Sequence, residues 1–278
     1  MFSTRLNPTR PPAAYRAILE RVGAACREAR PIEDECLSLG KSDERTQSIL
    51  ADHGVTAIGI PISEGGAGDD PLLVAMTAER IGREGLKLVE WFAEHVAGSA
   101  TRAAGPETAA SAEARPDDLD YAEFRYRSNL AFCWAAGRIG VLADCLETIA
   151  SFCAERIRDN GSASTEPAIV RIVAQTGSDL EATRAITYAA AELKAEFDRH
   201  PHSKHLRLEA GTLVAEAYQV SARSVVRMIL LTRGTTIAGA PLANCLPPRH
   251  RVFVEHGHTA AKPDEWAESQ IARYYLFE

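Results

Sequence analysis

Apolar residues recur at spacings of three and four along most of this 278-residue chain, which is the pattern of helices that bury one face. In the first half, the pattern predicts helices over about 11–30 and 42–53, and a third that begins at Pro71 and continues through Ile81. A fourth helical pattern ends near Ala97. Apolar runs with the alternation of β-strands are nearly absent, so the sequence predicts an all-α fold.

Three longer helical patterns fill most of the second half, over about 139–159, 167–200 and 204–231, and a short one follows over about 263–276. Long neighbouring helices joined by short turns bury their apolar faces against one another. The second half is therefore expected to form an antiparallel helical bundle.

Residues 99–118 are small and polar, and they are interrupted by glycine and proline. Such a stretch is typical of a linker. It predicts two parts, an N-terminal helical domain over 1–98 and a C-terminal helical bundle over 119–278. Between the second and third helices, the glycine-rich connection 59–68 matches neither phosphate-binding glycine pattern, so we expect it to form a tight turn.

The charge, the apolar runs and the cysteine spacing indicate which partners and which cellular compartment to expect. The net charge is −7, from 31 Lys and Arg against 38 Asp and Glu, and no cationic block is long enough to follow a nucleic acid. No apolar run reaches the length of a membrane span, and residues 1–12 lack the apolar core of a signal peptide. The six cysteines never form a C-x-x-C pair. We expect a cytoplasmic protein with reduced thiols in its core, without a membrane or nucleic-acid partner.

Several segments resemble the acyl-CoA dehydrogenase superfamily. The resemblance rests on the segments 50–69, 78–83, 136–140, 171–174, 182–185 and 188–190. It implies an N-terminal helical domain, a C-terminal four-helix bundle and flavin chemistry, with FAD or FMN as the cofactor. It also implies a homo- or hetero-oligomer that assembles through the C-terminal bundle.

The sequence departs from the family in places that contact the flavin. Only about twenty residues separate the helix ending near Ala97 from Leu119, so the central β-domain of the family is expected to be absent. Asn160-Gly161 and Pro167 stand where the family has an aromatic-glycine pair and a glutamine that touch the flavin. These departures predict a shortened member of the family with an impaired flavin site.

The segment 239–256 is similar to the flavin-monooxygenase branch of the family. Arg249 and His256 keep the spacing of that branch, although Asn244 and His250 replace its first arginine and its aspartate. Because histidine titrates near neutral pH, His256 is a candidate acid or base, together with Glu255 and Arg249. The alternative is a polar connection that satisfies helix ends or a subunit interface.

Three other groups of residues are candidates for a catalytic, metal-binding or pocket-lining role. Glu123 lies one residue out of register with the base of one dehydrogenase branch. A histidine cluster near residue 200 lacks the spacing of a metal site, so we expect a solvated loop and no metal there. Aromatic side chains are expected to pack in the core or to line an acyl or aromatic pocket. These are Trp91, Phe92, Phe124, Tyr126, Phe132 and Trp134.

The sequence thus predicts an acyl-CoA dehydrogenase-like oxidoreductase that acts on an acyl thioester or a related small molecule. Two alternatives remain open at this point. One is a non-redox enzyme that uses acid–base chemistry in the helical pocket, for example in secondary metabolism. The other is a non-catalytic partner subunit of a complete enzyme.

Overall fold

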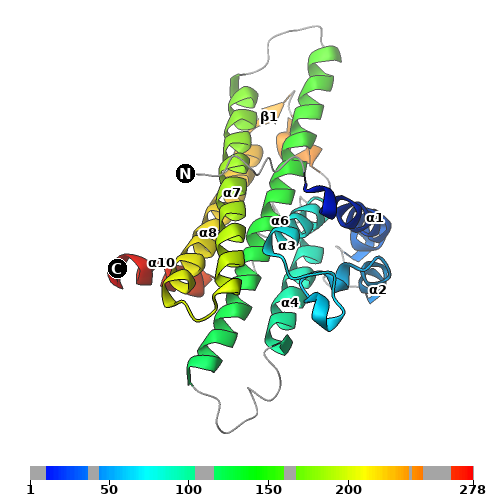
Figure 1. The fold of residues 1–278 in the computed structure, drawn as a ribbon. Coiled ribbons are helices and arrows are strands. Elements are labelled where there is room, and N and C mark those ends of the chain that lie inside the picture. The colour runs from blue at the N-terminus through cyan, green and yellow to red at the C-terminus, as the bar shows by residue number, and fades with distance from the viewer. Residues whose placement is uncertain are drawn as a thin grey trace.

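The computed structural model describes residues 11–36, 44–103, 116–159, 167–237, 240–246 and 264–277. The expected all-α fold is confirmed (Figure 1). The helices are α1 (Ala13–Cys36), α2 (Glu44–Asp52), α3 (Pro71–Gly82), α4 (Leu86–Ala103), α6 (Pro116–Asp159), α7 (Pro167–Arg199), α8 (Lys204–Arg233) and α10 (Asp264–Phe277). Short 3-10 turns cover Val55–Ala57, Ile62–Glu64 and Leu242–Cys245, and two-residue strands β1 (Thr236–Ile237) and β2 (Ala240–Pro241) pair antiparallel.

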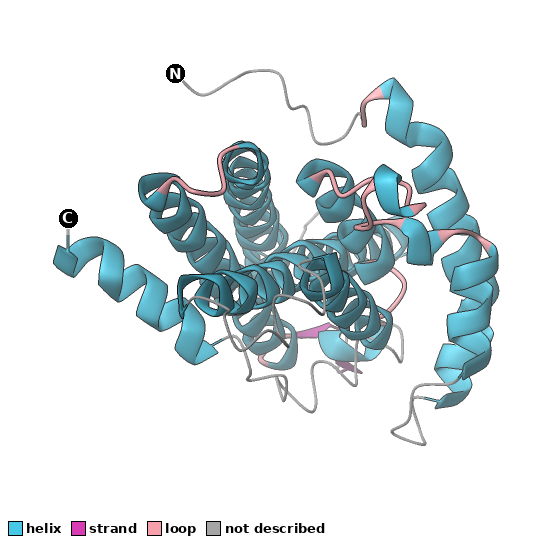
Figure 2. Cartoon of the chain, turned by 60° about the horizontal axis from the view of Figure 1, so that its bottom comes forward, coloured by secondary structure: helices cyan, strands magenta, loops and turns pink. Residues whose placement is uncertain are grey.

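The long helices α6, α7 and α8 pack against one another as a bundle, and α10 packs on α8. Helices α3 and α4 pack on α6, and α1 covers α3 from the outside. The helices at the two ends of the chain lie on opposite sides of the bundle (Figures 1 and 2). Helix α6 is therefore central, because it contacts both the N-terminal helices and the rest of the bundle.

Glycines allow α3 to cross α6 at close range. A Cβ atom at Gly82 would overlap the carbonyl oxygen of Gly137, and one at Gly140 would overlap the carbonyl oxygen of Glu79. The two backbones meet where larger residues have no room. The crossing also fixes the orientation of the α3 residues that face the bundle.

The glycine-rich connection before α3 forms the tight turn that the sequence predicts. Gly59 and Gly68 have positive φ angles, and the amide of Gly59 donates to the carbonyl oxygen of Gly68 at 2.9 Å. The hydroxyl of Ser99 on α4 donates to the carbonyl oxygen of Gly59 at 3.0 Å. At the other end, the Asp70 side chain accepts from the amide of Leu72 and caps α3. The connection is thus fastened to both neighbouring helices.

One apolar core runs from the N-terminal helices into the bundle. It contains side chains such as Leu50 and Phe92 together with Phe132, Phe197 and Tyr218. The expected packing role of the aromatic residues is confirmed for Phe92, Phe124, Phe132 and Trp134, which are buried. Free thiols occur at Cys26, Cys133, Cys145, Cys153 and Cys245, and the first four are buried, as expected.

One segment of the described chain, Tyr121–Glu155, is long and apolar enough to cross a membrane by length and composition. Its most apolar window is 89% buried inside the fold. Such burial is typical of the core helix of a soluble protein.

Several helices are longer than the sequence pattern predicts. Helix α1 continues to Cys36 through Pro31, although proline removes one helical hydrogen bond. Helix α4 extends to Ala103 and α6 begins at Pro116, so helices occupy both ends of the predicted linker 99–118. Residues 104–115 lie outside the described residues. The small residues in these helix ends suit a helix as well as a loop, because alanine is the strongest helix former.

Candidate functional site

Three side chains form a buried polar cluster where α3 meets α7. An Arg184 guanidinium nitrogen, Nη2, donates to Oε1 of Glu79 at 2.8 Å, and the Tyr188 hydroxyl donates to Oε2 of the same carboxylate at 2.8 Å. The side chains of Arg184 and Glu79 are only 7% and 12% exposed. The other guanidinium nitrogen, Nη1, reaches Glu181 at 2.6 Å. Both oxygens of Glu79 are thus engaged by donors from one neighbouring helix.

The surroundings of this cluster favour a neutral phenol at Tyr188. Burial raises the pKa of Tyr188 well above its ordinary value, and the charge and hydrogen bond of Glu79 raise it further. Burial lowers the pKa of Arg184, but the charge and hydrogen bond of Glu79 outweigh that effect and raise it. At neutral pH the tyrosine is therefore neutral, and the hydrogen bonds of Tyr188 and Arg184 to Glu79 form a joint between α3 and α7.

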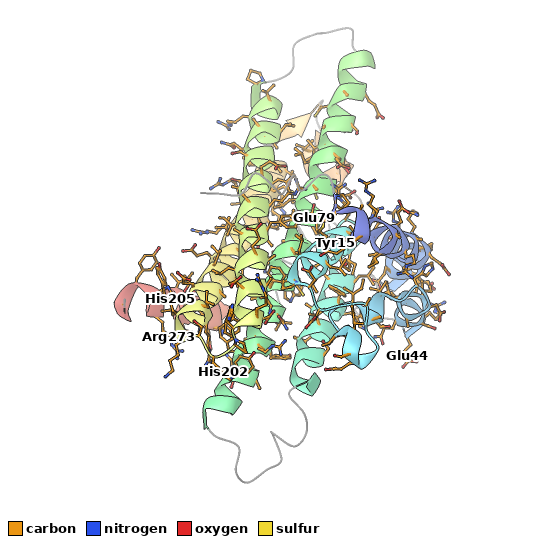
Figure 3. The ribbon with its side chains drawn as sticks, in the orientation of Figure 1. Tyr15, Glu44, Glu79, His202, His205 and Arg273 are labelled. Carbon is orange, nitrogen blue, oxygen red and sulfur yellow. The ribbon has the colours of Figure 1, made fainter. Side chains whose placement is uncertain are left out.

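A groove opens beside this joint, between α1, α3 and α7. Its volume is about 800 Å³, and Glu79, Arg184 and Tyr188 form part of its wall. The remaining polar wall comes from Arg16, Glu20, Arg27, Arg80 and Arg83, and the apolar wall comes from Pro11, Leu19 and Met76. Figure 3 labels Glu79 in the middle of the molecule and Tyr15 on α1. The groove is large enough for a small molecule and is mainly cationic.

A second hollow lies beneath the glycine-rich connection, where the N-terminal helices meet α6 and α7. It has a volume of about 70 Å³, and its walls include Gly59, Asp69, Asn129, Lys194 and Asp198. Pro61, Val74, Ser99, Arg125 and Phe132 also contribute. The cavity therefore combines both signs of charge with an amide and apolar side chains.

Two polar groups of this cavity, Asn129 on α6 and Lys194 on α7, lie on helix faces that point away from water. Asn129 and Lys194 are both nearly buried. The Lys194 ammonium lies 3.2 Å from Oδ2 of Asp198, one helical turn further along α7. The side chain of Asn129 also lines the cavity, and an amide there can donate to or accept from a ligand or water.

A third hollow lies between α6, α8 and α10, with a volume of about 600 Å³. It contains Glu123, one of the predicted candidates. The Glu123 side chain is 60% exposed and forms an ion pair with Arg127 at 2.5 Å on the same helix. The structure thus places Glu123 at a solvated edge, in a hollow that none of Glu79, Arg184 and Tyr188 lines.

The predicted candidates Arg249, Glu255 and His256, with their neighbour His250, lie outside the described residues. Their role stays a prediction. Asn244 is described and is exposed near the end of the last 3-10 turn.

The histidine cluster near residue 200 lies at the turn between α7 and α8, as expected. His200 and His205 are exposed and lie 3.3 Å from Glu196 and Glu209 respectively. Figure 3 shows His202 and His205 in the same region as Arg273, towards α10. Within the described chain, no group of three histidine, cysteine or acidic side chains is placed to hold a metal ion.

Sequence reasoning missed the residues that the structure brings together. Glu79, Arg184 and Tyr188 stand inside the segments that resemble the family, but spacing alone does not show that they meet. Asn129 and Lys194 interrupt apolar helix faces, and a polar residue in such a position is the feature of the sequence that could have indicated a site. Their grouping depends on the packing of α6 against α7, which one sequence does not supply.

Comparison with known proteins identifies the fold. The crystal structure of dibenzothiophene monooxygenase (TdsC) from Paenibacillus sp. A11-2 matches with a TM-score of 0.71 and 12% sequence identity, over 94% of this chain and 97% of that one. The complex of TdsC with FMN and indole matches with a TM-score of 0.72 at the same identity and coverage. No protein-family model and no curated protein matches the chain. The chain thus has the helical fold of acyl-CoA dehydrogenase type that TdsC also has.

Proposed function

We propose that the protein is a divergent oxidoreductase of the acyl-CoA dehydrogenase type, shortened by loss of the central β-domain, with an impaired flavin site. The observation that carries the proposal is the fold likeness to a monooxygenase whose structure contains FMN. A flavin supplies redox chemistry when bound. Fold alone does not determine chemistry, which depends on the residues that line the hollows.

The described hollows do not fit a whole flavin well. The cavity beneath the glycine-rich connection, at about 70 Å³, is far smaller than the roughly 300–1,000 Å³ of small-molecule pockets. The groove of about 800 Å³ is large enough, but arginines dominate its wall and few apolar side chains are available to cover a flat ring. This poor fit supports an impaired flavin site.

We assign the reacting end of the substrate to the cavity beneath the glycine-rich connection. The amide of Asn129 and the ammonium of Lys194 would donate to a carbonyl oxygen there, and Phe132 and Val74 supply apolar contacts. An acyl thioester has this combination of a polarised carbonyl and an apolar chain. The substrate class is therefore an acyl thioester or a related carbonyl compound.

The same cavity also favours a second candidate, a non-redox enzyme. The nearly buried Lys194 pairs with Asp198, whose side chain is 25% exposed, and such a pair suits acid–base chemistry without a flavin. This candidate predicts a colourless protein that ignores flavins. No contact among the described residues of this cavity favours the remaining alternative, a non-catalytic partner subunit.

We further propose that the protein is cytoplasmic and assembles through its C-terminal bundle. Val226 and Leu230, one helical turn apart on α8, are exposed apolar side chains that a second subunit would cover. A second copy would also supply a wall that the lost β-domain no longer provides.

Size-exclusion chromatography with light scattering and visible absorbance tests these proposals together. We expect a colourless dimer or larger assembly after purification, which takes up FMN or FAD only when the flavin is in excess. Stoichiometric flavin that survives purification would contradict an impaired site. A monomer would contradict assembly, and failure to bind either flavin in excess would reject the cofactor.

A further inference from the structure

The arginines of the groove between α1, α3 and α7 are not balanced by protein carboxylates. Arg184 is paired with Glu79 and Glu181, and Arg83 is paired with Glu147 at 2.9 Å. Within the described part of the chain, Arg16, Arg27 and Arg80 have no carboxylate partner. Glu20 is the one groove carboxylate left to offset them. The groove thus retains an excess of positive charge in a concave site.

Arg80 is held at the centre of this charge. A Cβ atom at Gly23 would come within 2.9 Å of two guanidinium nitrogens of Arg80, so the glycine on α1 leaves room for the guanidinium between α1 and α3. Helix spacing places Arg16, Glu20, Gly23 and Arg27 along one face of α1. The guanidinium therefore lies against a helix face that carries two further arginines.

The surroundings of Arg80 oppose its charge. Burial lowers the pKa of Arg80, and the positive charges of Arg83, Arg27 and Arg30 lower it further. The neighbouring thiol of Cys26 does not provide a counter-charge, because burial raises its pKa to about 12 and keeps it neutral. Arg30 is itself paired with Glu84. Like charges that are held together without a counter-ion favour the binding of an anion.

We propose that this groove binds the phosphate group of a small molecule, with Arg80 as the central contact and Arg27 and Arg16 at the rim. A guanidinium matches phosphate because its planar N–H groups donate two parallel hydrogen bonds. The volume of about 800 Å³ exceeds the space needed by a bare phosphate ion and leaves room for an attached organic group. The proposal goes beyond the proposed function and does not require that a flavin binds.

Calorimetric titration at constant ionic strength tests the proposal, with inorganic phosphate, pyrophosphate and adenosine monophosphate as probes. We expect saturable binding by the wild type, and Arg80→Gln should weaken it by at least about tenfold. The matched control is Arg223→Gln, which removes one exposed positive charge from α8, outside the groove. It should change the affinity by less than about twofold.

A thermal melt distinguishes a ligand contact from a structural role of Arg80. Since Arg80→Gln relieves repulsion between arginines, the ligand-free variant should melt at or above the wild-type Tm, and phosphate should no longer raise that Tm. Absence of saturable binding by all three probes would overturn the proposal, and so would equal weakening by the two variants. Tighter binding of adenosine monophosphate than of phosphate would identify a phosphomonoester as the ligand, whereas equal affinities would identify free phosphate.

Discussion

Glu79 is the residue on which the contact between α3 and α7 depends most. Its carboxylate accepts from Arg184 and Tyr188, and all three side chains are largely buried. Removing one charge of a buried pair leaves the other charge uncompensated, and this is costly because water cannot solvate it. The exposed partner of Arg184, Glu181, contributes far less because water screens its charge.

We therefore expect Glu79→Gln to lower the free energy of unfolding by about 3 kcal/mol. The control Glu181→Gln removes the other carboxylate of the same arginine and should cost less than about 1 kcal/mol. Urea unfolding at pH 7 measures both values. Equal losses for the two variants would show that the buried joint has no special role.

For single residues, the sequence predicted the local environment better than the contacts with distant residues. The turn role of Gly59 and the solvated position of His205 followed from local pattern and are confirmed. The grouping of Glu79 with Arg184 did not follow, because it joins residues that are 105 positions apart in the chain. Such contacts are set by helix packing, which local spacing does not encode.

Among the elements, the crossing of α3 over α6 determines how the N-terminal helices meet the bundle. At Gly140 an added methyl group would overlap the backbone of α3, whereas at Gly177 on α7 it would lie 3.7 Å from the nearest atom, a Leu146 side-chain carbon. Both glycines lie inside helices. Replacing each of these glycines with alanine therefore separates the steric effect of the crossing from the intrinsic helix preference of alanine.

Gly140→Ala should destabilise the protein by about 1–3 kcal/mol, because the overlap forces the two helices apart. Gly177→Ala should be neutral or stabilising by up to about 1 kcal/mol, since alanine favours the helix. Thermal unfolding followed by circular dichroism compares the two variants. If Gly140→Ala is as stable as Gly177→Ala, the close approach of α3 and α6 is wrong.

The number and order of the helices were largely predictable, and their ends were less so. Asp70 and Pro71 gave the start of α3 correctly, because capping is a local interaction. The extension of α4 and α6 into the predicted linker was missed, because packing of their other turns stabilises these ends. The pattern over 139–159 was likewise the second half of a longer helix.

For the whole molecule, the helical fold matches that of TdsC, and the described residues form two hollows on which the proposals rest. Among the described residues, the cationic groove and the small polar cavity have no lining residue in common. The cavity is the proposed place of the acyl carbonyl, and the groove is the proposed place of a phosphate group. The two proposals use different residues and can fail separately.

Anaerobic mixing of the protein with excess FMN and a series of acyl thioesters tests whether the protein is an oxidoreductase. We expect protein-dependent loss of visible flavin absorbance with at least one thioester, slowed by Asn129→Ala and unchanged by the exposed control His202→Gln. Absence of flavin reduction by every thioester, in a sample shown to bind FMN, would contradict the oxidoreductase proposal and favour the non-redox alternative.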